Sequence, residues 1–213
     1  MPQRHITFDC GKLMLEGVLH TPSNTQPPYP GVVICHPHPL YGGDMNSSVV
    51  MAIVDGVVSR GIAALRFNFR GVGGSEGTHD KGMGEKDDVR AALTRLAEEK
   101  EIDRNRNGLA GYSFGTGVAI AVATTEPSVT CLALVAPILA GINTPAALAY
   151  GKPKLLIAGD MDAHIPVEQV HELGRKRMAE PLQIEVVHGA DHFFFGHEEE
   201  IAKLAGDFFK RWL

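Results

Sequence analysis

The pattern G-x-S-x-G, in which a serine can act as a nucleophile, is found at Gly111–Gly115. It overlaps the end of a predicted strand, Asn107–Tyr112, and precedes a run of small residues, Phe114–Thr125, so Ser113 is expected on a turn between a strand and a helix. There the glycines let neighbouring backbone approach, and the helix points N–H groups at developing negative charge. Taken alone, a glycine-rich strand–helix turn explains the pattern equally well.

A serine hydroxyl is a weak nucleophile unless a base removes its proton, so the second residue required is a histidine. His192, one of ten histidines, follows the last predicted strand, Leu182–Val187, and is therefore expected at the same sheet edge as Ser113. His188 is a competitor, although it lies nearer the strand end and is less able to reach across the site. An ordinary solvated loop histidine is the alternative for either residue.

The base in turn needs an acid that fixes its tautomer. The loop after the predicted strand Lys154–Ala158 offers Asp160 and Asp162. We favour Asp162, which lies deeper in the loop, and interpret Asp160 as a turn residue or a supporting group, since a lone loop aspartate usually marks a turn or a helix cap. The order Ser113, Asp162, His192, each after a separate strand, is the chain order of the α/β-hydrolase triad.

Acyl transfer also needs an oxyanion hole, which two backbone N–H groups can form. One is expected from Phe114, directly after the nucleophile. The other is expected from the loop His36–Gly43, which follows the predicted strand ending at Cys35. Two prolines in this loop have no N–H to donate. Leu40 is the first choice for the second donor, and His38 is the second choice.

Two further features suggest other chemistry. His36 and His38 are a possible metal pair, but no further ligands with suitable spacing accompany them. The segment Asn68–Ser75, which overlaps the glycine-rich loop Arg70–Gly77, resembles a phosphate cradle, yet it lacks the Gly-Lys-Ser/Thr ending and the ordered G-x-G-x-x-G of a dinucleotide fold. We interpret this loop as structural, with Arg70 holding carbonyls or a carboxylate, and expect neither a metal nor an organic cofactor.

These residues must be positioned by a sheet whose strands end at a common edge. An antiparallel hairpin, Arg4–Cys10 with Lys12–His20, opens the chain, and strands then alternate with helices. The later predicted strands are Gly31–Cys35, Ile62–Phe67, Asn107–Tyr112, Val129–Val135, Lys154–Ala158 and Leu182–Val187. The predicted helices are Ser48–Ser59, Gly84–Lys100, Phe114–Thr125, Pro166–Met178 and Glu198–Leu213. This alternation predicts a mostly parallel sheet with helices on both faces and ligands at the carboxyl ends of the strands.

The composition, with 44% hydrophobic and 21% charged residues, is that of an ordinary soluble globular protein. A formal net charge of −5 gives no reason to expect a nucleic-acid partner. No apolar stretch reaches the roughly 18 residues needed to span a bilayer, and the N-terminus has no apolar signal core. Three widely spaced cysteines favour buried thiols in a reducing compartment. We therefore expect a cytoplasmic protein without a membrane span, and leave open whether it is a monomer or a homodimer.

Together these residues resemble the α/β-hydrolase superfamily and, within it, the small bacterial serine hydrolases and esterases related to dienelactone hydrolases. The resemblance covers nearly the whole chain. It rests on five motifs in order, which are HPHPLYGG at 36–43, FNFRGVG at 67–73, GYSFG at 111–115, GDMDAHIP at 159–166 and ADHFF at 190–194. It implies a single α/β-hydrolase domain over residues 1–213 that acts on a small-molecule ester without a cofactor.

The resemblance also implies that Ser113, His192 and Asp162 cleave a carboxylic ester through an acyl-enzyme. Dienelactone hydrolases themselves use a cysteine nucleophile, so a chain with serine at this position is not expected to act on dienelactone. The family often carries a lid between the sixth strand and the acid, but Ala136–Pro153 is too short for a large cap. This favours small or extended acyl substrates. The alternatives are a thioesterase with the same triad and, in a different class, a non-catalytic binding module on the same fold.

Overall fold

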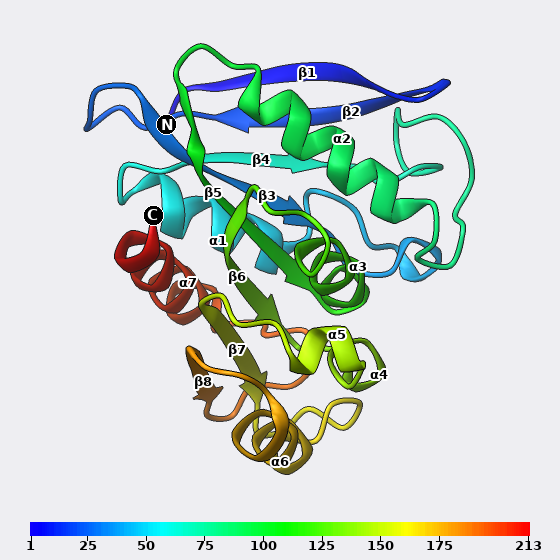
Figure 1. Ribbon diagram of the computed structural model, residues 1–213, viewed down its shortest axis with the longest axis vertical. Helices are drawn as coiled ribbons and strands as arrows, with labels where there is room; N and C mark the ends of the chain where they lie inside the picture. Colours follow the sequence, from blue (N-terminus) through cyan, green and yellow to red (C-terminus); the bar gives the residue numbers. More distant parts are fainter.

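The computed structural model describes residues 1–213 and has one eight-stranded sheet at its centre (Figure 1). The strands are β1 (Gln3–Cys10), β2 (Leu13–His20), β3 (Tyr29–Cys35), β4 (Ala63–Phe67), β5 (Ile102–Tyr112), β6 (Val129–Val135), β7 (Lys154–Gly159) and β8 (Leu182–Val187). The helices are α1 (Ser48–Val58), α2 (Glu85–Ala97), α3 (Phe114–Ala123), α4 (Leu139–Ile142), α5 (Pro145–Leu148), α6 (Val167–Arg177) and α7 (Glu198–Trp212), with a 3-10 turn, η1 (Pro39–Tyr41).

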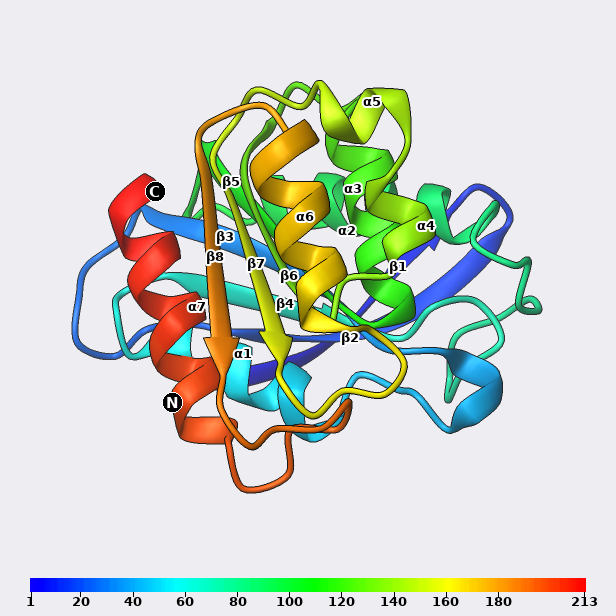
Figure 2. The same cartoon turned by 90° about the horizontal axis from the view of Figure 1, so that it is seen from below.

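The strand order in the sheet is β1-β2-β4-β3-β5-β6-β7-β8. β1 pairs with β2, and β2 with β4, in antiparallel fashion, whereas β4 and β3 and all later strands run parallel. Helices α1 and α7 cover one face, and α2, α3 and α6 cover the other (Figure 2). The predicted fold is therefore confirmed: an α/β-hydrolase domain with a mostly parallel sheet and an N-terminal antiparallel hairpin.

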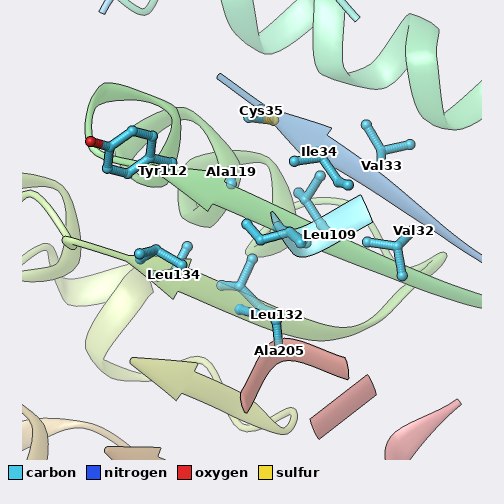
Figure 3. Packing of buried hydrophobic residues seen from close by; sticks show 14 of the residues in the cluster. Val32, Val33, Ile34, Cys35, Leu109, Tyr112, Ala119, Leu132, Leu134 and Ala205 are labelled. Atoms are coloured by element: carbon cyan, nitrogen blue, oxygen red, sulfur yellow. The ribbon is translucent and has the colours of Figure 1, made fainter. Parts of the chain in front are cut away.

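The central strands are buried on both faces because helices lie above and below them. Strands β3, β5 and β6 contribute close-packed aliphatic side chains, among them Val32, Leu109 and Leu132 (Figure 3). Burying one such side chain contributes about 1.5–3 kcal/mol. The 61 buried residues of this apolar cluster form one connected core. The helices on both faces are therefore packed on the same core as the carboxyl ends of the strands.

The connection between β6 and β7 is the segment in which a lid was considered. It contains only the two single-turn helices α4 and α5, so the structure has no large lid, as the sequence predicted. The largest difference from a predicted boundary is at β5, which begins at Ile102 instead of Asn107, because Ile102 pairs with Tyr29 before the register shifts. Every helix is too short or too polar to cross a membrane.

Candidate active site

Ser113 lies on a sharp turn between β5 and α3, as its sequence context predicts. Its backbone has φ +51° and ψ −118°, a region that an L-residue rarely adopts and that requires support from its surroundings. The Ser113 N–H donates to the Val135 carbonyl of the neighbouring strand at 2.9 Å. The Thr116 hydroxyl donates to the Ser113 carbonyl at 2.5 Å. These two bonds hold the turn from both sides and leave the serine hydroxyl free.

The two glycines of the turn are required by close backbone contacts. A Cβ on Gly111 would lie 2.5 Å from the Gly115 carbonyl oxygen. A Cβ on Gly115 would lie 2.5 Å from the Cys35 oxygen and 2.6 Å from the His36 oxygen. The turn after β5 is therefore pressed against the loop after β3, from which the second oxyanion donor is expected.

The structure brings Ser113, His192 and Asp162 together. The Ser113 Oγ lies 2.9 Å from His192 Nε2, and His192 Nδ1 lies 2.7 Å from Asp162 Oδ2. The Asp162 side chain is fully buried, and its Oδ1 accepts the N–H groups of His164 at 2.8 Å and Ile165 at 2.9 Å. A carboxylate held in this way accepts a hydrogen bond from the Nδ1–H group, so the other ring nitrogen, Nε2, is available to accept the serine proton.

All three side chains come from loops at the carboxyl ends of the strands. In Figure 2 the arrows of β7 and β8 point toward the loops that carry the aspartate and the histidine. The two loops are joined by the Met161 N–H, which donates to the Ala190 carbonyl at 3.0 Å. The Tyr112 hydroxyl donates to the His192 carbonyl at 2.9 Å. Burial, with Asp162 nearby, raises the pKa of Tyr112 to about 12, so this donor stays protonated at neutral pH.

The competing aspartate and histidine pair with each other. Asp160 Oδ2 lies 2.8 Å from His188 Nδ1, and Asp160 Oδ1 accepts the Gly189 N–H at 2.7 Å. The hydrogen bond from His188 is the main reason why the pKa of Asp160 is lowered. The His188 side chain is 86% exposed, so this pair fixes the surface of the loop after β8 and does not contact Ser113.

The expected oxyanion donors differ in how free they are. Phe114 is the first residue of α3, where an N–H has no acceptor within the helix. The Leu40 N–H donates to His38 Nδ1 at 3.2 Å within η1, and the Leu40 side chain is 72% exposed. The backbone N–H of His38 has no acceptor in the protein, and His38 lines the cleft beside Ser113. The 3-10 turn, which was not predicted, thus occupies the backbone N–H of Leu40, the first choice, and leaves that of His38, the second choice, free.

His36 has a structural role that the sequence reasoning missed. Its Nδ1 lies 2.7 Å from the Pro37 carbonyl, and its Nε2 accepts the Phe69 N–H at 3.0 Å. Burial lowers the pKa of His36 to about 4, so the ring is neutral at pH 7. Because both ring nitrogens are engaged, neither is available to a metal, and no three His, Cys, Asp or Glu side chains lie together in metal-binding geometry. His36 ties the loop after β3 to the loop after β4.

Arg70 anchors the glycine-rich loop, in agreement with its structural interpretation. Its guanidinium donates to Asp88 on α2 at 2.7 Å from Nη2 and at 3.0 Å from Nε. The Asp88 side chain is fully buried, so the charge of this carboxylate is balanced almost entirely by Arg70. The loop is therefore fixed to helix α2.

Ser113 opens into a cleft of about 850 Å³. Most of its walls are apolar or aromatic. The lining residues are Pro37, His38, Tyr41, Gly42, Gly43, Ser47, Ser48, Tyr112, Ser113, Phe114, Ile138, His164, His192, Phe193 and Phe195. Such a lining suits a neutral organic substrate better than a highly charged one.

Comparisons with known proteins point to one family and one fold. A model of the dienelactone hydrolase family matches residues 15–210. The structure of an α/β serine hydrolase homologue from Coxiella burnetii is 32% identical, with a TM-score of 0.85 and 97% of each chain covered. An α/β serine hydrolase without a lid from Xanthomonas campestris is 26% identical, with a TM-score of 0.87 over 100% of this chain and 97% of that one. An uncharacterised protein of Rickettsia prowazekii is 32% identical over 194 residues, 86% of this chain and 80% of the relative.

Proposed function

Because the chain belongs to the dienelactone hydrolase family and is a hydrolase of the α/β serine hydrolase type, we propose that it cleaves carboxylic esters with Ser113 as nucleophile. The observation that carries this proposal is the continuous hydrogen-bonded chain from Ser113 Oγ through His192 to the buried Asp162. A non-catalytic binding module has no need for this arrangement or for the strained backbone at the serine.

The proposed reaction has two steps. His192 Nε2 takes the proton of Ser113 while the oxygen attacks the ester carbonyl, and the alcohol then leaves with that proton. Water repeats the cycle on the acyl-enzyme and releases the acid. Asp162 stays ionised throughout and stabilises the imidazolium.

The oxyanion that forms in each step is stabilised by two backbone N–H groups in this proposal. The first is that of Phe114. The second is that of His38 and not of Leu40, since the Leu40 amide already donates to the His38 ring. Each such donor typically accounts for about 10²–10³-fold in rate.

We expect the cleft to accept small or extended acyl groups, because no large lid covers it. A thioester carbonyl fits the same chemistry. Parallel kcat/KM measurements on p-nitrophenyl butyrate and butyryl-CoA separate an esterase from a thioesterase, and we expect the ester to be the better substrate.

The replacement Ser113→Ala tests the nucleophile. We expect kcat/KM for p-nitrophenyl butyrate to fall by at least about 10⁴-fold, because no other group can form the acyl-enzyme. A fluorophosphonate probe should label the wild type and not this variant. His188→Ala is the matched control and should keep the wild-type rate, since His188 faces solvent. Wild-type turnover in Ser113→Ala, or an unlabelled wild type, contradicts the proposal.

A further inference from the structure

Two phenylalanine rings beside the proposed base have no role in the core. Phe193 is 52% exposed and Phe195 is 71% exposed. Their rings are stacked, with centroids 5.9 Å apart and an interplanar angle of 17°. We call these two residues the aromatic pair. Large apolar side chains that lie together at the surface usually mark a place where something binds.

The backbone holds the aromatic pair in position at an energetic cost. Phe194, between the two exposed residues, has φ +55° and a fully buried ring. A left-handed conformation is unfavourable for a phenylalanine and persists only where the surroundings impose it. Here the Phe193 N–H donates to Asp191 Oδ1 at 2.9 Å, and the His197 N–H donates to the Phe194 carbonyl at 3.0 Å. The chain thus buries the middle ring and leaves both outer rings on the cleft.

The aromatic pair lies next to the group that must protonate the leaving alcohol. The Phe193 ring packs edge-on against the His192 ring, with centroids 5.8 Å apart and an interplanar angle of 86°. A general acid must be within hydrogen-bond reach of the atom that it protonates, so the alcohol oxygen of the ester lies at His192 Nε2. In the proposed mechanism the carbonyl oxygen accepts hydrogen bonds from the Phe114 and His38 amides. The first atoms beyond the alcohol oxygen therefore meet the aromatic pair.

We propose that the aromatic pair is a subsite for an apolar, ring-bearing leaving group, so that esters of arylmethyl alcohols are preferred substrates. This inference rests on the ester hydrolysis proposed above. The bond between the carbonyl carbon and the alcohol oxygen breaks, the alcohol leaves with the proton from His192, and water supplies the hydroxyl of the released acid. A ring on the alcohol gains offset or edge-on contact with Phe195 and Phe193, whereas a ring on the acid does not.

Benzyl acetate and methyl phenylacetate provide the test, because they are isomers that carry the same ring on the alcohol and on the acid, respectively. The kcat/KM values of both are measured for the wild type, Phe195→Ala and Phe193→Ala. We expect each replacement to lower kcat/KM for benzyl acetate by about threefold to tenfold, the range that corresponds to loss of one aromatic contact. The ratio of kcat/KM for benzyl acetate to that for methyl phenylacetate should fall in each variant, and this ratio is the readout because Phe193 also contacts the His192 ring. Turnover of methyl phenylacetate shows that the variant is folded.

Two further variants control for the loss of apolar surface and for the ring itself. Met14→Ala removes an exposed apolar side chain on β2, away from the cleft, and should leave both rates unchanged. Phe195→Tyr keeps the ring and should keep the wild-type rate on benzyl acetate.

The outcomes separate the subsite from the proposed function. If the Phe195→Ala and Phe193→Ala variants lower kcat/KM equally for both isomers, or only for methyl phenylacetate, the proposed subsite is wrong. The proposed ester hydrolysis is then unaffected. If the wild type hydrolyses aliphatic esters but not benzyl acetate, the subsite is likewise wrong. If the wild type hydrolyses no ester and no fluorophosphonate labels Ser113, the proposed function itself has failed.

Discussion

At the residue scale, Asp160 and Asp162 show how environment separates two identical side chains. They lie two positions apart in one loop. Asp162 is fully buried and contacts His192 and two backbone N–H groups. Asp160 is partly exposed and contacts His188 and one N–H group. Of the two, only Asp162 can fix the His192 ring, whose Nε2 reaches Ser113.

We predict that Asp162→Asn lowers kcat/KM for p-nitrophenyl butyrate by about 10³–10⁴-fold, because an amide favours the wrong tautomer of His192. Asp160→Asn should keep a rate within about threefold of the wild type, since loss of a surface pair changes little. Steady-state kinetics of both variants check this. Comparable losses of kcat/KM in the two variants would contradict the assignment of Asp162, rather than Asp160, as the partner of the base.

The sequence predicted these three side chains from context and not from the pentapeptide alone. The same G-x-S-x-G pattern is present at Gly73–Gly77, where Ser75 donates to the Asn68 carbonyl at 2.7 Å and accepts the Glu16 N–H at 3.0 Å. That serine is a structural group without a base. What distinguishes Ser113 is a buried strand before it and a helix after it. The engagement of the Leu40 amide was not predictable, because it depends on a turn closed by the His38 ring.

At the element scale, apolar runs identified the central strands correctly because both faces of these strands are buried. Short elements were missed. The helices α4 and α5 and the turn η1 have three or four residues each, too few for a periodic pattern. The first half of β5 was missed as well, since its polar residues 103–106 resemble a loop. Loops with little pattern of their own are fixed by contacts from distant parts of the chain, as Arg70 fixes the glycine-rich loop to α2.

We predict that Arg70→Met lowers the free energy of unfolding by about 3–5 kcal/mol, because it leaves the Asp88 carboxylate buried without its partner. The matched control is Arg90→Met on α2, whose partner Asp87 on that helix is exposed. It should lower stability by less than about 1 kcal/mol. Urea denaturation at pH 7 measures both. A loss for Arg70→Met no greater than that of the control would mean that the buried pair contributes little.

At the scale of the whole molecule, two buried histidines are expected to make the free energy of unfolding depend on pH. Burial lowers the pKa of His20 to about 4, as it does for His36. The unfolded chain, with ordinary histidines, binds more protons than the folded one between pH 6.5 and 4. Stability is therefore complete above pH 6.5 and falls as the pH is lowered toward 4.

We predict that the free energy of unfolding falls between pH 7.5 and pH 5, by about 2 kcal/mol for each of these histidines. His20→Gln keeps an acceptor for the Arg66 Nε–H, which His20 Nε2 accepts at 3.0 Å, but it cannot titrate. The drop in the free energy of unfolding between the two pH values should be smaller in this variant than in the wild type by about 1–2 kcal/mol. Because each protein is compared with itself, any effect of the substitution at neutral pH cancels. An equal loss in wild type and variant would exclude His20 as a source.

The connection between β6 and β7 divides the molecule into two complementary parts. Residues 1–143 carry the proposed nucleophile and both proposed amide donors, and residues 144–213 carry the proposed acid and base. The boundary falls between Asn143 and Thr144, which are exposed and lie between two single-turn helices. On the proposed mechanism neither fragment alone can turn over an ester. Fused to two interacting partners, the fragments would form a split reporter, in which hydrolysis signals that β6 and β7 have paired again.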